Sequence, residues 1–150
     1  MNIVYIDHYA GSDYHGMEFR PYYLSKEWLK MGHHVTIIAA DYSHLRKVNP
    51  ITHADWEEST IDGVDFNWVK VSQYEGNGLK RILSMVQFVS KISLHAKEIA
   101  QKYSPDVVIC SSTYPFDTYA GQRIKKYSNA KLIHEVHRSE EHTSELQSRH

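Results

Sequence analysis

Two glycines, Gly11 and Gly16, flank a short polar segment that could bind an anion. The segment follows an apolar run ending at Ile6 and precedes a stretch with helical spacing. Backbone N–H groups in such a loop, together with the positive end of the following helix, can hold a phosphate group. The spacing matches neither the dinucleotide fingerprint nor the P-loop. The pattern by itself therefore fits a tight loop as well as an anion site.

A histidine at the end of an apolar run, His137, is a second candidate. In a strand it would share a face with Glu135, and it could hydrogen-bond a sugar hydroxyl or stabilise developing charge. A strand-end histidine bonded only to backbone fits the same position. His134 would point to the opposite face of the strand, so the two rings cannot bind one metal ion. Because the chain also has no Cys/His framework, we expect no metal site.

Two further polar segments could contact a ligand. One follows an apolar run and carries hydroxyl groups on Ser111, Ser112, Thr113 and Tyr114. The other begins a long helical pattern with Lys80 and Arg81, directly after a loop containing a tyrosine and two glycines. Basic and aromatic groups together can contact a phosphate or an anionic membrane surface. A solvated helix face would give the same pattern.

Strands and helices are needed to bring these residues together. Apolar runs predict strands at residues 3–6, 35–40, 106–110 and 130–137. Helical spacing predicts three helices, one ending at Gly32, one over 79–103 and one over 117–128. The predicted inward face of the first is Met17, Pro21, Leu24, Trp28 and Met31. That of the second is Ile82, Leu83, Val86, Val89, Ile92, Ser93, Ala96, Ile99, Ala100 and Tyr103.

Asp62-Gly63 lies between two strand-like runs and is a strong hairpin signal. The remaining strands and helices alternate, and strand–helix–strand crossovers of this kind are nearly always right-handed. We therefore expect an α/β, Rossmann-like fold, with a mostly parallel sheet, helices on both faces and a small β-hairpin. Ligands of such folds bind at the carboxyl ends of the strands. The segments containing Gly11, Ser111 and His137 would all lie at that edge.

Composition narrows the function classes. The 150 residues carry a net charge of −1, so a nucleic-acid binder that depends on a basic surface is not expected. The single cysteine, Cys110, permits no disulfide framework, which favours a cytoplasmic location. No segment approaches the roughly 18 apolar residues of a membrane span, and no signal peptide is recognised.

The order of several motifs over residues 1–137 resembles the N-terminal domain of family 4 glycosyltransferases, which are retaining enzymes of the GT-B fold. The matching motifs are Arg20-x3-Leu24-x3-Trp28-Leu29-x2-Gly32-His33-x-Val35-Thr36, Pro105-Asp106-Val107-Val108 and Lys131-Leu132-Ile133-x-Glu135-Val136-His137. The first 28 residues look closest to bacterial members that build surface polysaccharide.

The resemblance implies two Rossmann-like domains that face each other across a cleft, with the nucleotide sugar bound mainly by the C-terminal one and the acceptor by the N-terminal one. It implies that Gly11, Ser12 and Gly16 lie near the donor diphosphate, and that His137 contacts the transferred sugar. The segment Ser111, Ser112, Thr113 and Tyr114 would line the acceptor side. The family needs no bound metal or other cofactor for catalysis, and its partners would be a nucleotide sugar and a glycan or lipid-linked acceptor.

The chain departs from the family after His137, where Arg138 replaces the usual aspartate. Residues 138–150 look like a translated sequencing adapter, so we expect a non-native or disordered polar tail; a genuine tail is the alternative. The donor domain is not among the 150 residues, and we expect this chain alone to be inactive. Two other interpretations remain open: a fragment of a GT-B-type sugar-nucleotide epimerase, and a stand-alone α/β module for binding or interaction. The expected location is cytoplasmic, with Lys80 and Arg81 as candidates for peripheral contact with the inner face of the membrane.

Overall fold

The computed structural model describes residues 1–12, 15, 19–42, 49–50, 54, 56–73, 78–112, 114 and 116–135. Within them, six strands form one sheet in the order β3-β4-β2-β1-β5-β6. The strands are β1 (Asn2–Ile6), β2 (His34–Ala40), β3 (Trp56–Ile61), β4 (Val64–Val69), β5 (Val107–Cys110) and β6 (Lys131–His134). The helices are α1 (Phe19–Lys30), α2 (Leu79–Leu94), α3 (Ala96–Tyr103) and α4 (Asp117–Lys126). The tail at 138–150 lies outside the described residues.

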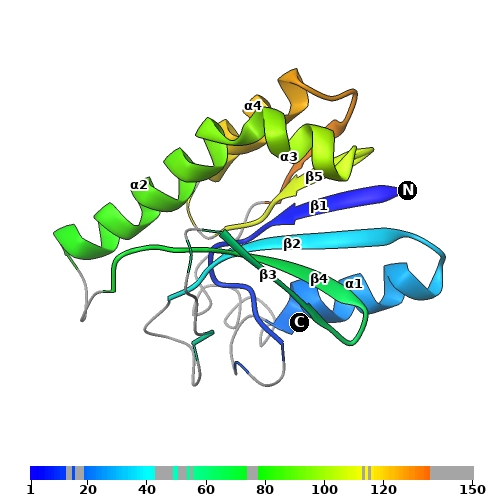
Figure 1. Ribbon diagram of the computed structural model, residues 1–150, viewed down its shortest axis with the longest axis horizontal. Coiled ribbons are helices and arrows are strands. Elements are labelled where there is room, and N and C mark those ends of the chain that lie inside the picture. The colour runs from blue at the N-terminus through cyan, green and yellow to red at the C-terminus, as the bar shows by residue number, and fades with distance from the viewer. Residues whose placement is uncertain are drawn as a thin grey trace, which may run out of the picture.

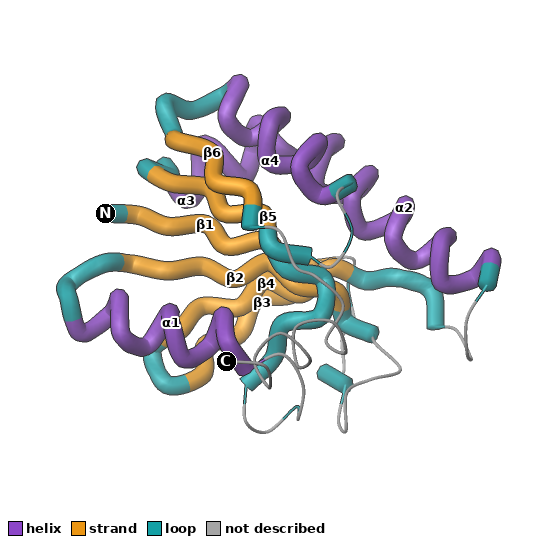
Figure 2. Tube along the Cα trace, turned by 180° about the vertical axis from the view of Figure 1, so that it is seen from behind, coloured by secondary structure: helices purple, strands orange, loops and turns teal. Residues whose placement is uncertain are grey.

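The sheet is sandwiched between helices, as the sequence predicts for a Rossmann-like fold. Helix α1 covers one face, and α2, α3 and α4 cover the other (Figures 1 and 2). Side chains of alternate strand residues enter the two cores: Tyr5 and Ile37 pack on the α1 side, whereas Ile6 and Ile38 pack on the other. All neighbouring strands run parallel except the β3–β4 pair. The α/β, mostly parallel fold is therefore confirmed.

The end of α1 is formed by a Schellman motif at the predicted glycine. Gly32 has φ +90°, and the N–H of His33 donates to the carbonyl of Trp28 at 3.0 Å. Met31 was predicted to face inward, and this is wrong: it lies beyond the helix in that turn and is 70% exposed. Tyr22 and Ser25 are buried on the inner face. The Ser25 hydroxyl is satisfied by donating to the carbonyl of Pro21 at 2.6 Å.

The predicted hairpin is present and forms part of the main sheet. Its turn residues, Asp62 and Gly63, both have positive φ, as a type I′ turn requires. Phe66 and Trp68 stack on the α1 side, with ring centroids 4.9 Å apart. In addition, β4 pairs in parallel with β2, so the hairpin widens the sheet by two strands. The sequence indicates the hairpin but not this parallel pairing.

The single helix predicted over 79–103 is wrong, because it is divided at His95 into α2 and α3. The His95 ring nitrogen Nδ1 bonds the Lys91 carbonyl at 2.9 Å, a side-chain contact that helps to end α2. The predicted inward positions Ile82, Leu83 and Val86 are also wrong, because each is about half exposed. The first turns of α2 extend beyond the carboxyl ends of the strands (Figure 1), so they have no sheet to cover.

Candidate functional site

The segments that follow β1, β5 and β6 meet at the carboxyl edge of the sheet. Each segment continues the backbone pairing of its strand. The N–H of Asp7 donates to the carbonyl of Ile38 at 3.0 Å. The N–H of Ser111 donates to the carbonyl of Ile6, and the N–H of Glu135 donates to the carbonyl of Cys110, both at 2.8 Å. These bonds hold the first residues after each strand side by side. The carboxyl edge is where α/β folds bind ligands, and we define these segments as the carboxyl-edge site.

A hydrogen-bonded chain of side chains ends on the carboxylate of Glu135. The Tyr5 hydroxyl donates to Ser111 Oγ at 3.3 Å, and Ser111 Oγ donates to Glu135 Oε1 at 2.8 Å. Arg20, in the first turn of α1, forms an ion pair with the same oxygen. Burial raises the pKa of the Tyr5 phenol, so it remains a neutral donor. The Glu135 side chain is 25% exposed. Its carboxylate is thus oriented by protein groups yet open to a ligand.

A second network fastens the segment after β1 to the segment after β5 and to α4. The backbone N–H of His8 donates to Ser112 Oγ at 3.0 Å, and the N–H of Ser112 donates to Asp117 Oδ2 at 2.8 Å. The His8 ring nitrogen Nδ1 and the Tyr114 hydroxyl are 2.7 Å apart. Burial raises the pKa of the Asp117 carboxyl. All four residues are buried, so this network joins the segments after β1 and β5 in the interior, whereas Glu135 is partly exposed.

The predicted glycine loop is described only in part. Gly11 and Ser12 are buried, and Gly16 lies outside the described residues. A Cβ on Gly11 would lie 2.8 Å from the Cβ of His15, so the close approach of His15 requires a glycine. The backbone N–H of Ser12 donates to His15 Nδ1 at 3.1 Å. The described part of the loop is therefore tightly packed around His15, and its anion-binding role stays a prediction.

The structure brings together some of the other predicted site residues. Ser111, Ser112 and Tyr114 lie in the two networks, whereas Thr113 and His137 lie outside the described residues. The sequence alone did not indicate roles for Tyr5, His8, Arg20, Asp117 and Glu135 in one site. The available signal was the position of polar residues directly after buried strands, because those positions meet at the same edge.

Lys80 and Arg81 lie in the first turn of α2, on the part that extends beyond the sheet (Figure 1). Lys80 is exposed and Arg81 is partly buried. Apolar side chains on the first turns of α2 are also exposed: Leu79 by 85%, Ile82 by 54%, Leu83 by 48% and Val86 by 51%. Within the described segments, no helix has both the length and the apolarity of a membrane span.

Metal-binding geometry is not found in the described part of the chain, where no three His, Cys, Asp or Glu side chains are grouped to hold an ion. Cys110 is buried, and burial raises the pKa of its thiol. It is therefore an inert core residue rather than a ligand or nucleophile.

Comparison with known proteins identifies a family and shows a likeness in fold to a solved structure. The model of the family described as Glycosyltransferase Family 4 matches residues 14–150. A solved chain described as "Trehalose-6-phosphate from E. coli bound with UDP-2-fluoro glucose" aligns over 89% of this chain with a TM-score of 0.51 and 9% sequence identity. This chain covers 32% of that chain, about a third of its length. No curated protein matched the sequence. At such low identity the structural likeness shows the fold alone.

Proposed function

Because this chain belongs to glycosyltransferase family 4, we propose that it forms the acceptor side of an enzyme that transfers a sugar from a nucleotide-sugar donor. The acceptor is a glycan or a lipid-linked saccharide of bacterial surface polysaccharide, and the anomeric configuration is retained. The observation that carries this proposal is the meeting of the segments after β1, β5 and β6 at one sheet edge. The UDP-2-fluoro glucose named for the solved fold match supports a nucleotide-sugar donor.

In this proposal, the acceptor hydroxyl oxygen forms a bond to the anomeric carbon as the bond from that carbon to the nucleoside diphosphate breaks, and the hydroxyl proton passes to the leaving diphosphate. Glu135, oriented by Ser111 and Arg20, accepts a hydrogen bond from a sugar hydroxyl and fixes the substrate's position. The loop between Gly11 and Gly16 faces the diphosphate, and His137 contacts the transferred sugar. Catalysis requires no metal ion, because backbone donors and basic residues of a second domain stabilise the leaving diphosphate.

The donor-binding domain is proposed to lie outside residues 1–150. The test compares this chain with a longer protein, in which the natural reading frame is followed past His137 to include a donor domain. Each is incubated with UDP-glucose and other nucleotide sugars and with a lipid-linked acceptor. We expect transfer by the longer protein and none by the 150 residues. Transfer by the 150 residues alone would contradict the proposal that a separate domain binds the donor. Interconversion of nucleotide sugars without an acceptor would favour an epimerase.

The exposed turns of α2 are proposed to contact the cytoplasmic face of the membrane, which would place the enzyme close to a lipid-linked acceptor. Leu79 and Ile82 supply apolar area, and Lys80 supplies positive charge. The test is flotation with vesicles of phosphatidylglycerol and phosphatidylcholine. Replacing Leu79 and Ile82 by serine should abolish binding. The control is Leu94→Ser, which changes an equally exposed leucine at the far end of the same helix and should bind as the unmodified chain does.

A further inference from the structure

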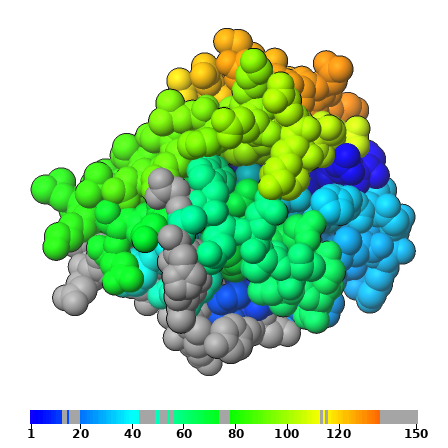
Figure 3. Space-filling view, viewed as in Figure 1, coloured from blue at the N-terminus to red at the C-terminus, as the bar shows by residue number. Residues whose placement is uncertain are grey.

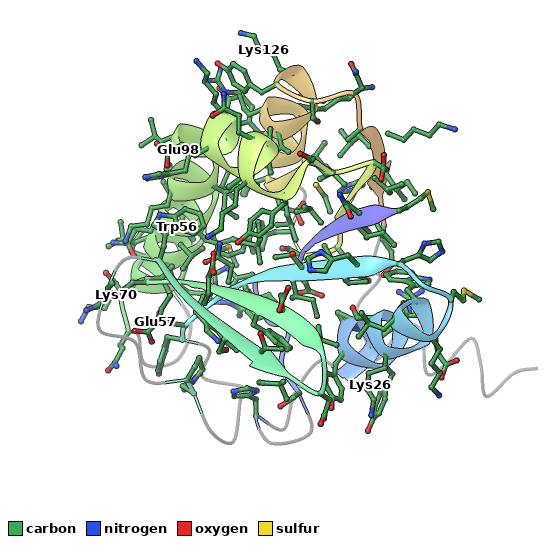
Figure 4. All side chains as sticks on the ribbon, turned by 45° about the vertical axis from the view of Figure 1, so that its right-hand side comes forward. Lys26, Trp56, Glu57, Lys70, Glu98 and Lys126 are labelled. Carbon is green, nitrogen blue, oxygen red and sulfur yellow. The ribbon has the colours of Figure 1, made fainter. Side chains whose placement is uncertain are left out.

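A pocket of about 510 Å³ lies between the β3–β4 hairpin and α3, separate from the carboxyl-edge site. Its walls include Trp56 and Glu58 from β3, Asn67 from β4, His95 before α3, and Glu98 and Tyr103 from α3. In Figure 3, side chains of the hairpin and of α3 adjoin on the face toward the viewer. Figure 4 shows Trp56 between the hairpin and α3, on the same side of the molecule as Glu98.

A fixed network holds the inner wall of this pocket. The Tyr103 hydroxyl donates to Glu58 Oε1 at 2.9 Å, and it accepts from Asn67 Nδ2 at 3.0 Å. Lys102 also forms an ion pair with Glu58. Because the one hydroxyl proton of Tyr103 goes to the carboxylate, its oxygen must receive an N–H group from Asn67. The orientation of the Asn67 amide is therefore determined, and its Oδ1 atom takes no part in this network.

Two buried polar atoms on the pocket wall have no hydrogen-bond partner. One is Asn67 Oδ1, an acceptor on a side chain that is 5% exposed, and the other is Trp56 Nε1, a donor. Native proteins rarely leave such groups unsatisfied, so each calls for an explanation. The Trp56 ring meets the His95 ring edge-on, with centroids 5.1 Å apart. The pocket thus combines one unused acceptor and one unused donor with aromatic surface.

The opposite character of these two atoms selects the ligand chemistry. A phosphate only accepts hydrogen bonds and an ammonium group only donates them, whereas a hydroxyl group does both. The carboxylate of Glu98 further disfavours an anion, whereas that of Glu58 is already paired with Lys102. A sugar ring carries several hydroxyl groups, and its apolar C–H face can pack against an aromatic ring. The volume lies within the range of small-molecule sites, about 300–1,000 Å³.

We propose that this pocket is a second saccharide site that binds one neutral sugar residue of a glycan. Asn67 Oδ1 accepts from one sugar hydroxyl, and Trp56 Nε1 donates to another. Both atoms are buried, so binding requires the side chains that cover them to shift. The proposal does not depend on sugar transfer, since the residues concerned are separate from Glu135, Ser111 and Arg20.

The experiment is a titration of the 150-residue chain, labelled with ¹⁵N, with glucose, galactose, N-acetylglucosamine and maltose. Trp28, Trp56 and Trp68 each give one indole N–H signal, and Trp56→Phe identifies that of Trp56. We expect saturable shifts for Trp56 and for backbone amides of β3, β4 and α3 with at least one of these sugars. The indole signal of Trp68 should not move, because its Nε1 already donates to Ser59 Oγ at 2.8 Å on the other face.

The variants test the site chemistry. Trp56→Phe keeps an aromatic ring but removes the donor, and it should weaken sugar binding about tenfold, as expected for one lost hydrogen bond in a buried site. Trp28→Phe, on the α1 side, is the matched control and should bind as the unmodified chain does. Should Trp56→Phe fail to fold, the proposal is tested by whether the backbone amides of β3, β4 and α3 show saturable shifts in the unmodified chain.

Three results would overturn the proposal: no saturable shift with any of the four sugars, shifts confined to residues outside β3, β4 and α3, or tighter binding of methylammonium or glucose 6-phosphate than of glucose. No nucleotide sugar is present and no transfer is measured. The outcome is therefore distinct from that of the proposed transferase function.

Discussion

The carboxyl edge of the sheet and the opposite amino edge, where the parallel strands begin, hold their polar residues in different ways. At the carboxyl edge, His8, Ser112 and Asp117 are buried and bonded to one another. At the amino edge, polar groups bond one another near the surface: the N–H of Asn2, for example, donates to the Asp106 carboxylate at 2.7 Å in an exposed contact. Burying polar groups costs free energy unless they are paired, so a fold that needs only stability has little reason to collect them. Their concentration at one edge indicates a site.

The largest expected difference between the edges comes from two glycines. A Cβ on Gly121 of α4 would lie 2.3 Å from Cys110 Sγ and 2.8 Å from Leu132 Cδ1, so Gly121→Val should lower the free energy of unfolding by about 3 kcal/mol. In the hairpin turn at the amino edge, a Cβ on Gly63 would meet Leu29 Cδ1 at an ordinary contact distance of 3.5 Å, but Gly63 has φ +84°, so Gly63→Ala should cost about 1 kcal/mol. Urea unfolding measures both. Equal losses would show that α4 does not pack on β5 as described.

A smaller difference is expected for single hydrogen bonds. Tyr114→Phe removes the buried contact with His8 and should lower the free energy of unfolding by about 1.5 kcal/mol. Asp106→Ala removes the contact with Asn2 at the amino edge, where water can replace the lost acceptor, and should cost about 0.5 kcal/mol. Thermal unfolding of the two variants gives the comparison. A greater loss of unfolding free energy for Asp106→Ala than for Tyr114→Phe would contradict the assignment of the stronger hydrogen bonds to the carboxyl edge.

The smallest expected effect is a pH dependence of the free energy of unfolding that arises from Asp117 at the carboxyl edge. Burial raises the pKa of Asp117 in the folded chain, so between its unfolded and folded pKa values the folded chain binds more protons than the unfolded one. Asp117 therefore makes the free energy of unfolding decrease as pH rises through that window. Asp117→Asn should flatten this part of the pH profile. An unchanged slope in the variant would show that another group is responsible.

Much of the fold can be predicted from local sequence. Apolar runs such as 106–110 predict buried strands, Asp62-Gly63 predicts the turn between β3 and β4, and Gly32 predicts the end of α1. These signals depend on neighbouring residues alone. The break at His95 was missed because the apolar spacing continues across it, and a side-chain bond to the Lys91 carbonyl has no pattern of its own.

The site was less predictable because its contacts join distant parts of the chain. Arg20 and Glu135 form an ion pair across 115 positions. Tyr5 looks like any strand residue until its hydroxyl is seen to donate to Ser111. Position after a strand indicates the edge at which a residue lies, whereas the partner it selects depends on strand order. That order includes the parallel pairing of β4 with β2, which no local pattern specifies.

The most direct test of the carboxyl edge as the functional site is the rate of sugar transfer by the longer protein carrying a donor domain. Glu135→Gln removes the charge at the carboxyl edge, and Asp65→Asn removes that of a carboxylate paired with His34 and Thr60 toward the amino edge. We expect Glu135→Gln to lower the rate of transfer at least about tenfold, through loss of a charged hydrogen-bond acceptor. Asp65→Asn should leave it unchanged. Equal rates for the two variants would contradict a substrate-binding role for the carboxyl edge.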